Sequence, residues 1–508
     1  MSKQPEGVDA SVNTEYYDVI IVGAGLSGIG AAAHLERECP GKRYLILEGR
    51  ERMGGTWDLF RYPGIRSDSD MHTLGYDFKP WRAEKAIADG AAILDYIRET
   101  AAEHDIDSHI RYGHRVTKAA WSSADAAWTI EAERTDTGES VAVRGNFLMM
   151  CSGYFSYERG YTPDFPGREH FGGEIVHPQD WPEDLDYAGK RVVVIGSGAT
   201  AMTLVPAMAE DAGHVVMLQR SPTYVVSRPD RDAIANFLRK VLPGRAAYAL
   251  TRWKNIGLQR WFYGRTRKAP EKVKRQLLKW VRDELGDDFD VEKHFTPDYD
   301  PWDQRLCLVP NSDLFRALRS GKASVVTDHV ELFTETGIRL ASGEEIEADI
   351  IITATGLDLV VLGGVRFAVD GQPVDFAETV TYRGMMYSGV PNMVSVFGYI
   401  NASWTLRADL IERFACRLIN HLDETANRQV TPRLRPQDRE MSLRPYVEDF
   451  TPGYMLRVIH LFPKQGDREP WTNPQDYGRD RKTFLEGPLE DGVLEFDKAD
   501  TRSRDRAA

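Results

Sequence analysis

Residues 17–51 have the sequence YDVIIVGAGLSGIGAAAHLERECPGKRYLILEGRE, and this stretch decides the fold of the first part of the chain. An apolar run, a glycine turn, an alanine-rich segment and a second apolar run ending at Glu48 predict a βαβ unit. In the turn Gly23-Ala24-Gly25-Leu26-Ser27-Gly28, the first Gly permits a tight bend. The second lets a pyrophosphate approach the backbone, and the third lets the helix pack on the strand. We therefore expect a dinucleotide site in which Glu48 accepts hydrogen bonds from ribose hydroxyls.

A second stretch, residues 190–222, repeats this pattern as KRVVVIGSGATAMTLVPAMAEDAGHVVMLQRSP. Its turn is Gly196-Ser197-Gly198-Ala199-Thr200-Ala201, which ends in Ala where the pattern allows Gly or Ala. The following strand ends at Arg220 and Ser221 instead of an acid, and a cation with a hydroxyl suits a 2′-phosphate. This favours NADPH. The alternative is that Arg220 is only a surface residue at a strand end.

The cysteines limit the chemistry that two dinucleotide sites could perform. Cys39, Cys151, Cys307 and Cys416 lie far apart and form no CxxC pair, so they predict neither a disulfide reductase nor a zinc site. We expect no metal. Without a dithiol, one site is expected to hold FAD and the other a nicotinamide donor that reduces it. Dioxygen is then the expected acceptor of the electrons.

The expected fold class is α/β, with two Rossmann-like dinucleotide-binding domains, one for FAD and one for NADP, and an inserted helical subdomain. A late apolar strand in ADIIITATG, residues 348–356, suggests that a nucleotide domain is interrupted and completed downstream. The predicted division places the FAD-binding domain at 1–155 and 386–508 with the C-terminal tail, the NADP-binding domain at 156–230 and 310–385, and the helical insert at 231–309.

The charge and hydropathy of this 508-residue chain limit the kinds of partner that it could bind. The net charge of −13 argues against nucleic acid as the main partner. The absence of a long apolar run and the polar N-terminus favour a cytoplasmic protein. Residues 239–282 differ, because they contain fourteen Lys or Arg and one acid, interleaved with aromatic and aliphatic residues. This stretch predicts basic helices that either are simply solvated, or associate peripherally with an anionic membrane, or form an entry lid for substrate.

Three further motifs resemble those of one enzyme family. Phe171, Gly173, His177 and Trp181 match the pattern FxGxxxHxxxW, and residues 54–68 have the sequence GGTWDLFRYPGIRSD. Residues 349–356 resemble a late ATG motif. Together they resemble the type I Baeyer–Villiger monooxygenases, which are class B flavoprotein monooxygenases. The amino-acid sequences of several segments are similar to those of the ethionamide-activating subgroup. The resemblance extends from Asp18 to beyond Trp404.

The resemblance implies an NADPH-consuming enzyme that uses FAD and O₂ to convert a ketone into an ester or lactone. It also implies S-oxygenation of sulfides or thioamides as a side activity. Two alternatives stay open: a flavin-containing N- or S-monooxygenase, and a non-oxygenating NADPH oxidase or redox flavoprotein. The sequence predicts no oligomeric state.

The resemblance also assigns roles to individual residues. The family's active-site arginine falls on Arg305, with Asp68 as its partner acid. Gln304 replaces a lysine that helps bind the 2′-phosphate in many relatives, which places more weight on Arg220. The FAD and site-lining residues that follow from the resemblance are Ser27, Glu48, Thr56, Trp57, Asp58, Leu59, Arg66, Ser67, Asp68 and Val116. Trp57 could alternatively be a core aromatic.

A histidine such as His177 in the fingerprint could act as an acid or a base. However, His177 lies just before the second nucleotide unit, and the mechanism has no evident proton for it to abstract there. We expect His177 to couple domain rotation to NADP binding, with direct proton transfer as the alternative.

Overall fold

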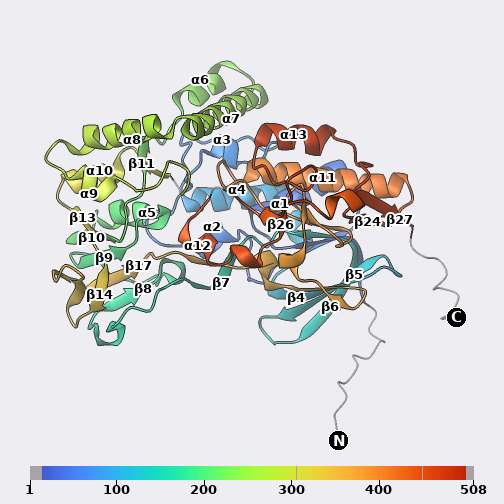
Figure 1. Ribbon diagram of the computed structural model, residues 1–508, viewed down its shortest axis with the longest axis horizontal. Coiled ribbons are helices and arrows are strands. Elements are labelled where there is room, and N and C mark those ends of the chain that lie inside the picture. Colours follow the sequence, from blue (N-terminus) through green and yellow to red (C-terminus); the bar gives the residue numbers. More distant parts are fainter. Residues whose placement is uncertain (1–13, 305, 449, 499–508) are drawn as a thin grey trace, which may run out of the picture.

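The computed structural model describes residues 14–304, 306–448 and 450–498, in which two large sheets and several small ones are surrounded by helices (Figure 1). The first sheet has the order β20-β19-β4-β5-β6-β1-β2-β3, with β23 also paired to β6. Its strands are β1 (Tyr16–Val22), β2 (Tyr44–Leu47), β3 (Ile110–Arg111), β4 (His114–Ser122), β5 (Ala127–Arg134), β6 (Ser140–Met150), β19 (Arg366–Val369), β20 (Gln372–Pro373) and β23 (Met393–Ser395). β1 pairs in parallel with both β2 and β6. Residues 19–22 are buried, as expected for a central strand covered on both faces.

The second sheet is parallel and has the order β13-β10-β9-β17-β8. Its strands are β8 (Glu174–Val176), β9 (Arg191–Ile195), β10 (His214–Gln219), β13 (Ala323–Thr327) and β17 (Ile350–Thr353). Ile351 of β17 lies opposite Val193 of β9, although more than 150 residues separate them in the sequence. The predicted fold class is confirmed: the protein is α/β with two Rossmann-like units, and the late strand completes the second sheet.

Helices cover both sheets, and a helix begins at each of the two glycine turns. α1 (Leu26–Glu38) follows the first turn and packs against α11 (Thr405–Glu424), with α4 (Gly90–Glu103) and α13 (Tyr477–Glu486) nearby. α5 (Ala199–Met208) follows the second turn and packs against α10 (Asp313–Arg319). Residues 31–33 of α1 are buried alanines, whose small side chains let neighbouring helices approach closely.

The predicted helical insert contains α6 (Ala233–Val241), α7 (Gly244–Lys268), α8 (Pro270–Leu285) and α9 (Val291–Phe295). α6, α7 and α8 lie along the upper edge of the molecule in Figure 1. α7 is anchored by Arg252, whose guanidinium donates to Gly75 O at 2.7 Å and to Asp409 Oδ2 at 3.0 Å. Within the described ranges, no helix is long and apolar enough to cross a membrane.

A two-stranded ribbon connects the sheets. β7 (Phe155–Gly160) follows β6 of the first sheet, β18 (Leu357–Leu359) follows β17 of the second, and the two pair antiparallel. The predicted domain boundaries stay a prediction, with one observation that bears on them. β19 pairs in parallel with β4 and buries Phe367 beside Trp128 in the first sheet's core, although we assigned its residues to the NADP domain.

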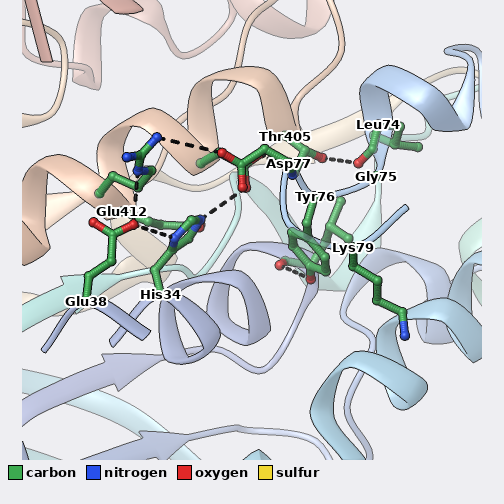
Figure 2. Close-up of polar contacts among 12 residues, drawn as sticks. His34, Glu38, Leu74, Gly75, Tyr76, Asp77, Lys79, Thr405 and Glu412 are labelled. Carbon is green, nitrogen blue, oxygen red and sulfur yellow. Dashed lines mark hydrogen bonds and ion pairs between the residues drawn. The ribbon is translucent and has the colours of Figure 1, made fainter. Parts of the chain in front are cut away.

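A buried ionic network joins α1 to α11 (Figure 2). His34 Nδ1 lies 3.3 Å from Glu38 Oε1, and Nε2 lies 3.4 Å from Asp409 Oδ1 and 3.8 Å from Glu412 Oε2. Burial lowers the pKa of His34, but its hydrogen bonds to Asp409 and Glu38 outweigh this and raise the pKa to about 10. His34, Asp409 and Glu412 have the spacing of metal ligands. A histidine with carboxylates at both ring nitrogens is instead suited to carry two protons and pair as a cation.

Candidate active site

A cavity lies between the two glycine turns and spans about 1560 Å³, part of which is open to solvent. It brings together nine of the predicted site residues: Gly25, Ser27, Thr56, Trp57, Arg66, Ser67, Asp68, Ala199 and Thr200. These residues come from the first turn, the 54–68 motif and the start of α5.

The first glycine turn is held by contacts that tolerate no side chain. Gly23 has φ +100°, and a Cβ there would lie 2.7 Å from Cys151 O. A Cβ on Gly28 would lie 1.8 Å from Gly23 O, which explains why the helix needs Gly at this position. The turn is braced by Glu48, because Ala24 N donates to Glu48 Oε2 at 2.7 Å. The motif therefore has the backbone geometry that its spacing predicts.

Glu48 lies at the end of β2, as predicted, and is 4% exposed. Its other oxygen accepts from Arg50 N at 2.9 Å. Burial raises the pKa of Glu48, and the two backbone donors oppose that shift. Each carboxylate oxygen keeps a further lone pair, with which it can accept a hydrogen bond from a ribose hydroxyl. The contact of Glu48 with the ribose stays a prediction.

The start of α1 forms a cradle for an anion. Its N-cap is Gly25, which provides no side-chain cap, and the first turn contains no acid, so the first N–H groups have no side-chain acceptor. Gly55 approaches from the opposite side, since a Cβ on it would lie 3.0 Å from Gly25 Cα. Bare backbone on both sides with a helix N-terminus fits the pyrophosphate of a dinucleotide. The residues present thus fit FAD at this turn.

Two aromatic residues that sequence reasoning missed form a wall of the cavity. Tyr154 and Trp404 stack with ring centroids 5.3 Å apart and planes 16° apart. Trp404 Nε1 donates to Ser27 Oγ at 2.9 Å, which ties the wall to the glycine turn. Tyr154 follows β6, the parallel neighbour of β1, and ligands bind beyond the carboxyl ends of such strands. That rule could have found Tyr154, whereas nothing in the sequence links it to Trp404.

The 54–68 motif divides into residues that face the cavity and residues that do not. Thr56 and Trp57 line it at the start of α2 (Thr56–Leu59), and Trp57 also packs on the first core. Asp58 is buried against Arg50 Nη2 at 2.9 Å, and Leu59 packs on the second core. Neither lines the cavity. The predicted contacts of Asp58 and Leu59 with FAD therefore stay predictions that this cavity does not support.

The structure describes only one residue of the predicted catalytic pair, Asp68. Asp68 lines the cavity beside Ser67 and Arg66, and Arg66 forms an ion pair with Asp313 of α10. Arg305 lies outside the described residues. Leu308 on β12 (Cys307–Pro310) lines the same cavity, so the chain that follows position 305 reaches the site. The pairing of Arg305 with Asp68 stays a prediction.

The second glycine turn has contacts like those of the first. Gly196 has φ +144°, and a Cβ there would lie 2.3 Å from Ala354 O. Ser197 Oγ donates to Ser221 O at 2.9 Å, so the turn touches the end of β10. A Cβ on Gly198 would meet nothing within 4 Å, which leaves the start of α5 open to an anion.

Arg220 and Ser221 are both exposed and follow β10 directly. Within the described part of the chain, Arg220 has no ion-pair partner. A cation next to the open turn fits a 2′-phosphate, whereas an arginine paired to a structural acid would not. Ala201 is buried in α5, and Val116 is buried on β4 away from the cavity, so the predicted cofactor contacts of both stay predictions.

The fingerprint residues occupy the edge of the second sheet. A Cβ on Gly173 would lie 2.2 Å from Asp349 O, so Gly lets β8 start beside β17. Phe171 packs edge-on to Phe333 with centroids 6.4 Å apart, and Trp181 packs on the second core. None of these three lines the cavity. Their spacing reflects the packing of a sheet edge.

His177 lies where the connecting ribbon of β7 and β18 meets the second sheet. Its Nε2 donates to Gly356 O at 3.1 Å, and its Nδ1 accepts from Gln179 N at 3.1 Å. These partners assign the proton to Nε2 of a neutral ring. Burial lowers the pKa of His177, against the opposing effect of the Gly356 carbonyl. With both nitrogens engaged and no place in the cavity lining, His177 is poorly placed to act as a base.

The chain is similar to known flavoproteins over almost its whole length. The sequence profile of the flavin-binding monooxygenase-like family matches residues 86–361, and that of an NAD(P)-binding Rossmann-like domain matches residues 21–83. "FAD-containing monooxygenase EthA" of Mycobacterium tuberculosis is 55% identical, covering 96% of this chain and 98% of the relative. "Probable FAD-binding monooxygenase AlmA" of Acinetobacter baylyi is 48% identical, covering 95% and 97%.

Solved structures share the fold at lower identity. A steroid monooxygenase bound to NADP superposes with a TM-score of 0.76 at 23% identity, covering 95% of this chain and all of that one. Cyclohexanone monooxygenase from Rhodococcus sp. Phi1 bound to NADP⁺ gives 0.72 at 21% identity, covering 96% and 100%.

Proposed function

This chain belongs to the flavin-binding monooxygenase-like family, and from that premise we propose that it is a Baeyer–Villiger monooxygenase. It would insert one oxygen atom of O₂ next to the carbonyl of a ketone, with NADPH as the reductant, and release an ester or lactone. The observation that carries this proposal is the aromatic-walled cavity lined by the starts of both glycine-turn helices, together with the FxGxxxHxxxW fingerprint.

Two cofactors follow from the family and from the two turns. FAD would be held by the first turn, by Glu48 and by the cradle of Gly25 and Gly55. NADPH would be held by the second turn, with Arg220 and Ser221 at its 2′-phosphate. When bound, FAD reduced by NADPH supplies the activation of O₂ that the protein's own side chains cannot provide.

The protein's residues would bind and polarise the substrate. Attack on a ketone carbon makes that carbon tetrahedral and places negative charge on the carbonyl oxygen. The guanidinium of Arg305, oriented by Asp68, would stabilise that charge. The wall of Tyr154 and Trp404 would exclude water, which strengthens every electrostatic contact inside.

A sulfide or thioamide would be a second substrate class of the same cavity. Sulfur donates an electron pair to oxygen directly, so S-oxygenation needs no carbonyl polarisation by Arg305. A flavin-containing N- or S-monooxygenase would perform only this reaction. A non-oxygenating NADPH oxidase would perform neither reaction and would reduce O₂ without substrate.

The coupling of NADPH consumption to product tests the proposal. We expect slow NADPH oxidation without substrate, a clear acceleration by a linear methyl ketone, and nearly one product molecule per NADPH consumed. Equal rates with and without ketone, with hydrogen peroxide as the product, would identify an oxidase and contradict the proposal.

We propose a cytoplasmic enzyme that associates peripherally with a membrane through the basic helices at 239–282.

A further inference from the structure

Exposed apolar side chains concentrate on the helical insert. Eight large apolar residues on α6, α7 and α8 are between 43% and 77% exposed: Ile234, Phe237, Val241, Leu250, Trp253, Leu258, Trp261 and Trp280. Trp253 is the most exposed of them at 77%. On α6, Ile234, Phe237 and Val241 follow the i, i+3, i+7 spacing of one helix face. An apolar face of this kind marks an interaction site.

The same helices present cations that have no acid to pair with. Across the described ranges, eight basic residues of this region form no ion pair: Arg239, Lys240, Arg245, Arg265, Lys268, Lys272, Lys274 and Arg275. Two of them, Arg239 and Lys274, donate hydrogen bonds to backbone carbonyls. Other cations here are paired, such as Lys254 with Asp232 at 2.6 Å and Arg267 with Asp303 at 2.7 Å. Since the chain as a whole carries −13, this face is a local exception. An anionic surface would attract this face and repel the rest of the molecule, which fixes one orientation.

The chemistry of this face fits a lipid surface better than a second copy of the chain. Aromatic and aliphatic residues mixed with Lys and Arg are typical of helices that lie in a bilayer interface. In a symmetric dimer each copy would bring the same cations to the interface, and like charges at close range are destabilising. Anionic phospholipid headgroups supply the missing negative charge, and acyl chains accept the apolar residues.

A groove beside α7 lies next to the active-site cavity. It encloses about 1060 Å³ and is lined on one side by Ile256, Trp261, Tyr263 and Gly264 of α7. The opposite side includes Tyr399 and Ala402, which also line the central cavity. Trp261 belongs to both the exposed apolar face and the groove. The two cavities therefore share a wall, and one of its two residues has only a methyl side chain.

We propose that the face formed by α6, α7 and α8 docks on anionic phospholipid and that the groove beside α7 admits an apolar substrate from the bilayer to the active site. This deepens the proposed function, on which it rests, by naming the substrate class. The substrate is a ketone or sulfide with a long hydrocarbon chain that partitions into lipid.

Vesicle sedimentation tests the docking step independently of catalysis. The FAD-loaded full chain is mixed with vesicles of phosphatidylglycerol and phosphatidylcholine, or of phosphatidylcholine alone, at low and high salt. We expect sedimentation with the anionic vesicles that weakens at high salt. The double variant F237S/W253S should bind at least about tenfold more weakly, because each substitution removes an exposed apolar side chain that would insert into the bilayer. Leu443→Ser is the matched control, because Leu443 is 48% exposed but lies outside these helices.

Three results would overturn the docking step. The first is no sedimentation with anionic vesicles. The second is equal binding by the wild type and F237S/W253S. The third is a change from dimer to monomer in F237S/W253S without lipid binding by the wild type, which would identify a second copy as the partner.

Gly264→Phe tests the groove. A Cβ on Gly264 meets nothing within 4 Å, so a larger side chain would fill the groove without a clash of its Cβ. The ratio of kcat/KM for a vesicle-borne long-chain methyl ketone to that for a short soluble one should fall about tenfold. A steric mismatch in an apolar pocket has an effect of this size on the discrimination between two substrates. Gly257→Phe lies on the same helix, has equal space and does not line the groove, so its ratio should match the wild type.

An unchanged ratio in Gly264→Phe would overturn the entry step. Absence of turnover on both ketones would contradict the proposed function instead, and the sedimentation result would still decide the docking step.

Discussion

His177 Nε2 donates a hydrogen bond of 3.1 Å to the carbonyl of Gly356, at the point where β17 of the second sheet passes into the connecting ribbon. The same carbonyl accepts from Tyr161 N at 3.1 Å, just after the other ribbon strand. The ring thus joins both connections between the sheets. Gly160 leaves room for it, because a Cβ there would lie 1.8 Å from His177 Cε1. This position supports a role in coupling the two nucleotide units.

His177→Gln tests that role. We expect kcat to fall about tenfold or more, because domain movement often limits turnover, while reduction of the flavin by NADPH in stopped flow keeps its rate. Gly160→Ala should reproduce the effect by displacing the ring. Gly257→Ala, at a site with no neighbours, is the control. Loss of flavin reduction in His177→Gln to the same extent as kcat would point to direct chemistry instead.

Arg220→Ala tests the 2′-phosphate site. A charge-assisted hydrogen bond to phosphate contributes about 2 kcal/mol, so kcat/KM for NADPH should fall about thirtyfold while that for NADH stays the same. Arg339→Ala removes another exposed arginine of the second nucleotide unit, on β15 (Gly337–Leu340), and should change neither value. An unchanged preference for NADPH in Arg220→Ala would show that the phosphate binds elsewhere.

Substitutions of Gly196 and Gly198 should have different effects, although both residues lie in the same turn. Gly196→Ala places a Cβ 2.3 Å from Ala354 O at φ +144°, so the melting temperature should drop by about 2 °C or more, as expected for roughly 2 kcal/mol or more of strain. Gly198→Ala meets no protein atom. Its melting temperature should stay unchanged while KM for NADPH rises about tenfold, because the Cβ would obstruct the pyrophosphate. Normal NADPH affinity in Gly198→Ala would place the pyrophosphate away from this turn.

The buried network predicts a pH dependence of stability. Burial raises the pKa of Glu412 well above its ordinary value, so the folded state holds a proton that the unfolded chain releases as pH rises. Glu412 therefore contributes stability at acid pH that is lost progressively above its unfolded pKa. Glu412→Gln keeps the neutral shape and should raise the melting temperature at pH 8 by at least about 2 °C, but not at pH 4.

Glu38→Gln should behave in the opposite way. Burial acts to raise the pKa of Glu38, but its bonds to His34 and Arg413 outweigh that effect and leave the pKa lowered. Its contribution is present at neutral pH and is lost as pH falls, so the variant should melt lower than the wild type at pH 7. Thermal melts of both variants from pH 4 to pH 9 check the pair. Parallel curves for wild type and Glu412→Gln would mean that Glu412 is ionised in the folded protein.

The sequence predicted the parts of the site that depend on local spacing. The turn at 23–28, its acid Glu48 and the second turn at 196–201 have the expected geometry. The close approach of Gly28 to Gly23, the bond of Ala24 to Glu48 and the βαβ connections all act within about 30 residues. The late strand β17 was also located, because a run of isoleucines predicts a buried parallel strand.

Contacts between distant segments could not be predicted in this way. Trp404 stacks on Tyr154 across 250 residues of sequence, and no spacing encodes that pair. Asp58 lies in a motif that lines the cavity, but Arg50 attracts its carboxylate away from the site. β19 joins the first sheet beside β4, and no spacing in its sequence encodes that partner.

Product analysis under ¹⁸O₂ tests the central claim most directly. The purified enzyme is supplied with NADPH and a linear methyl ketone, and the products are identified by mass spectrometry. The account predicts an ester that contains one ¹⁸O atom, formed in step with NADPH oxidation. Recovery of unchanged ketone, while a thioether under the same conditions gives labelled sulfoxide, would contradict it.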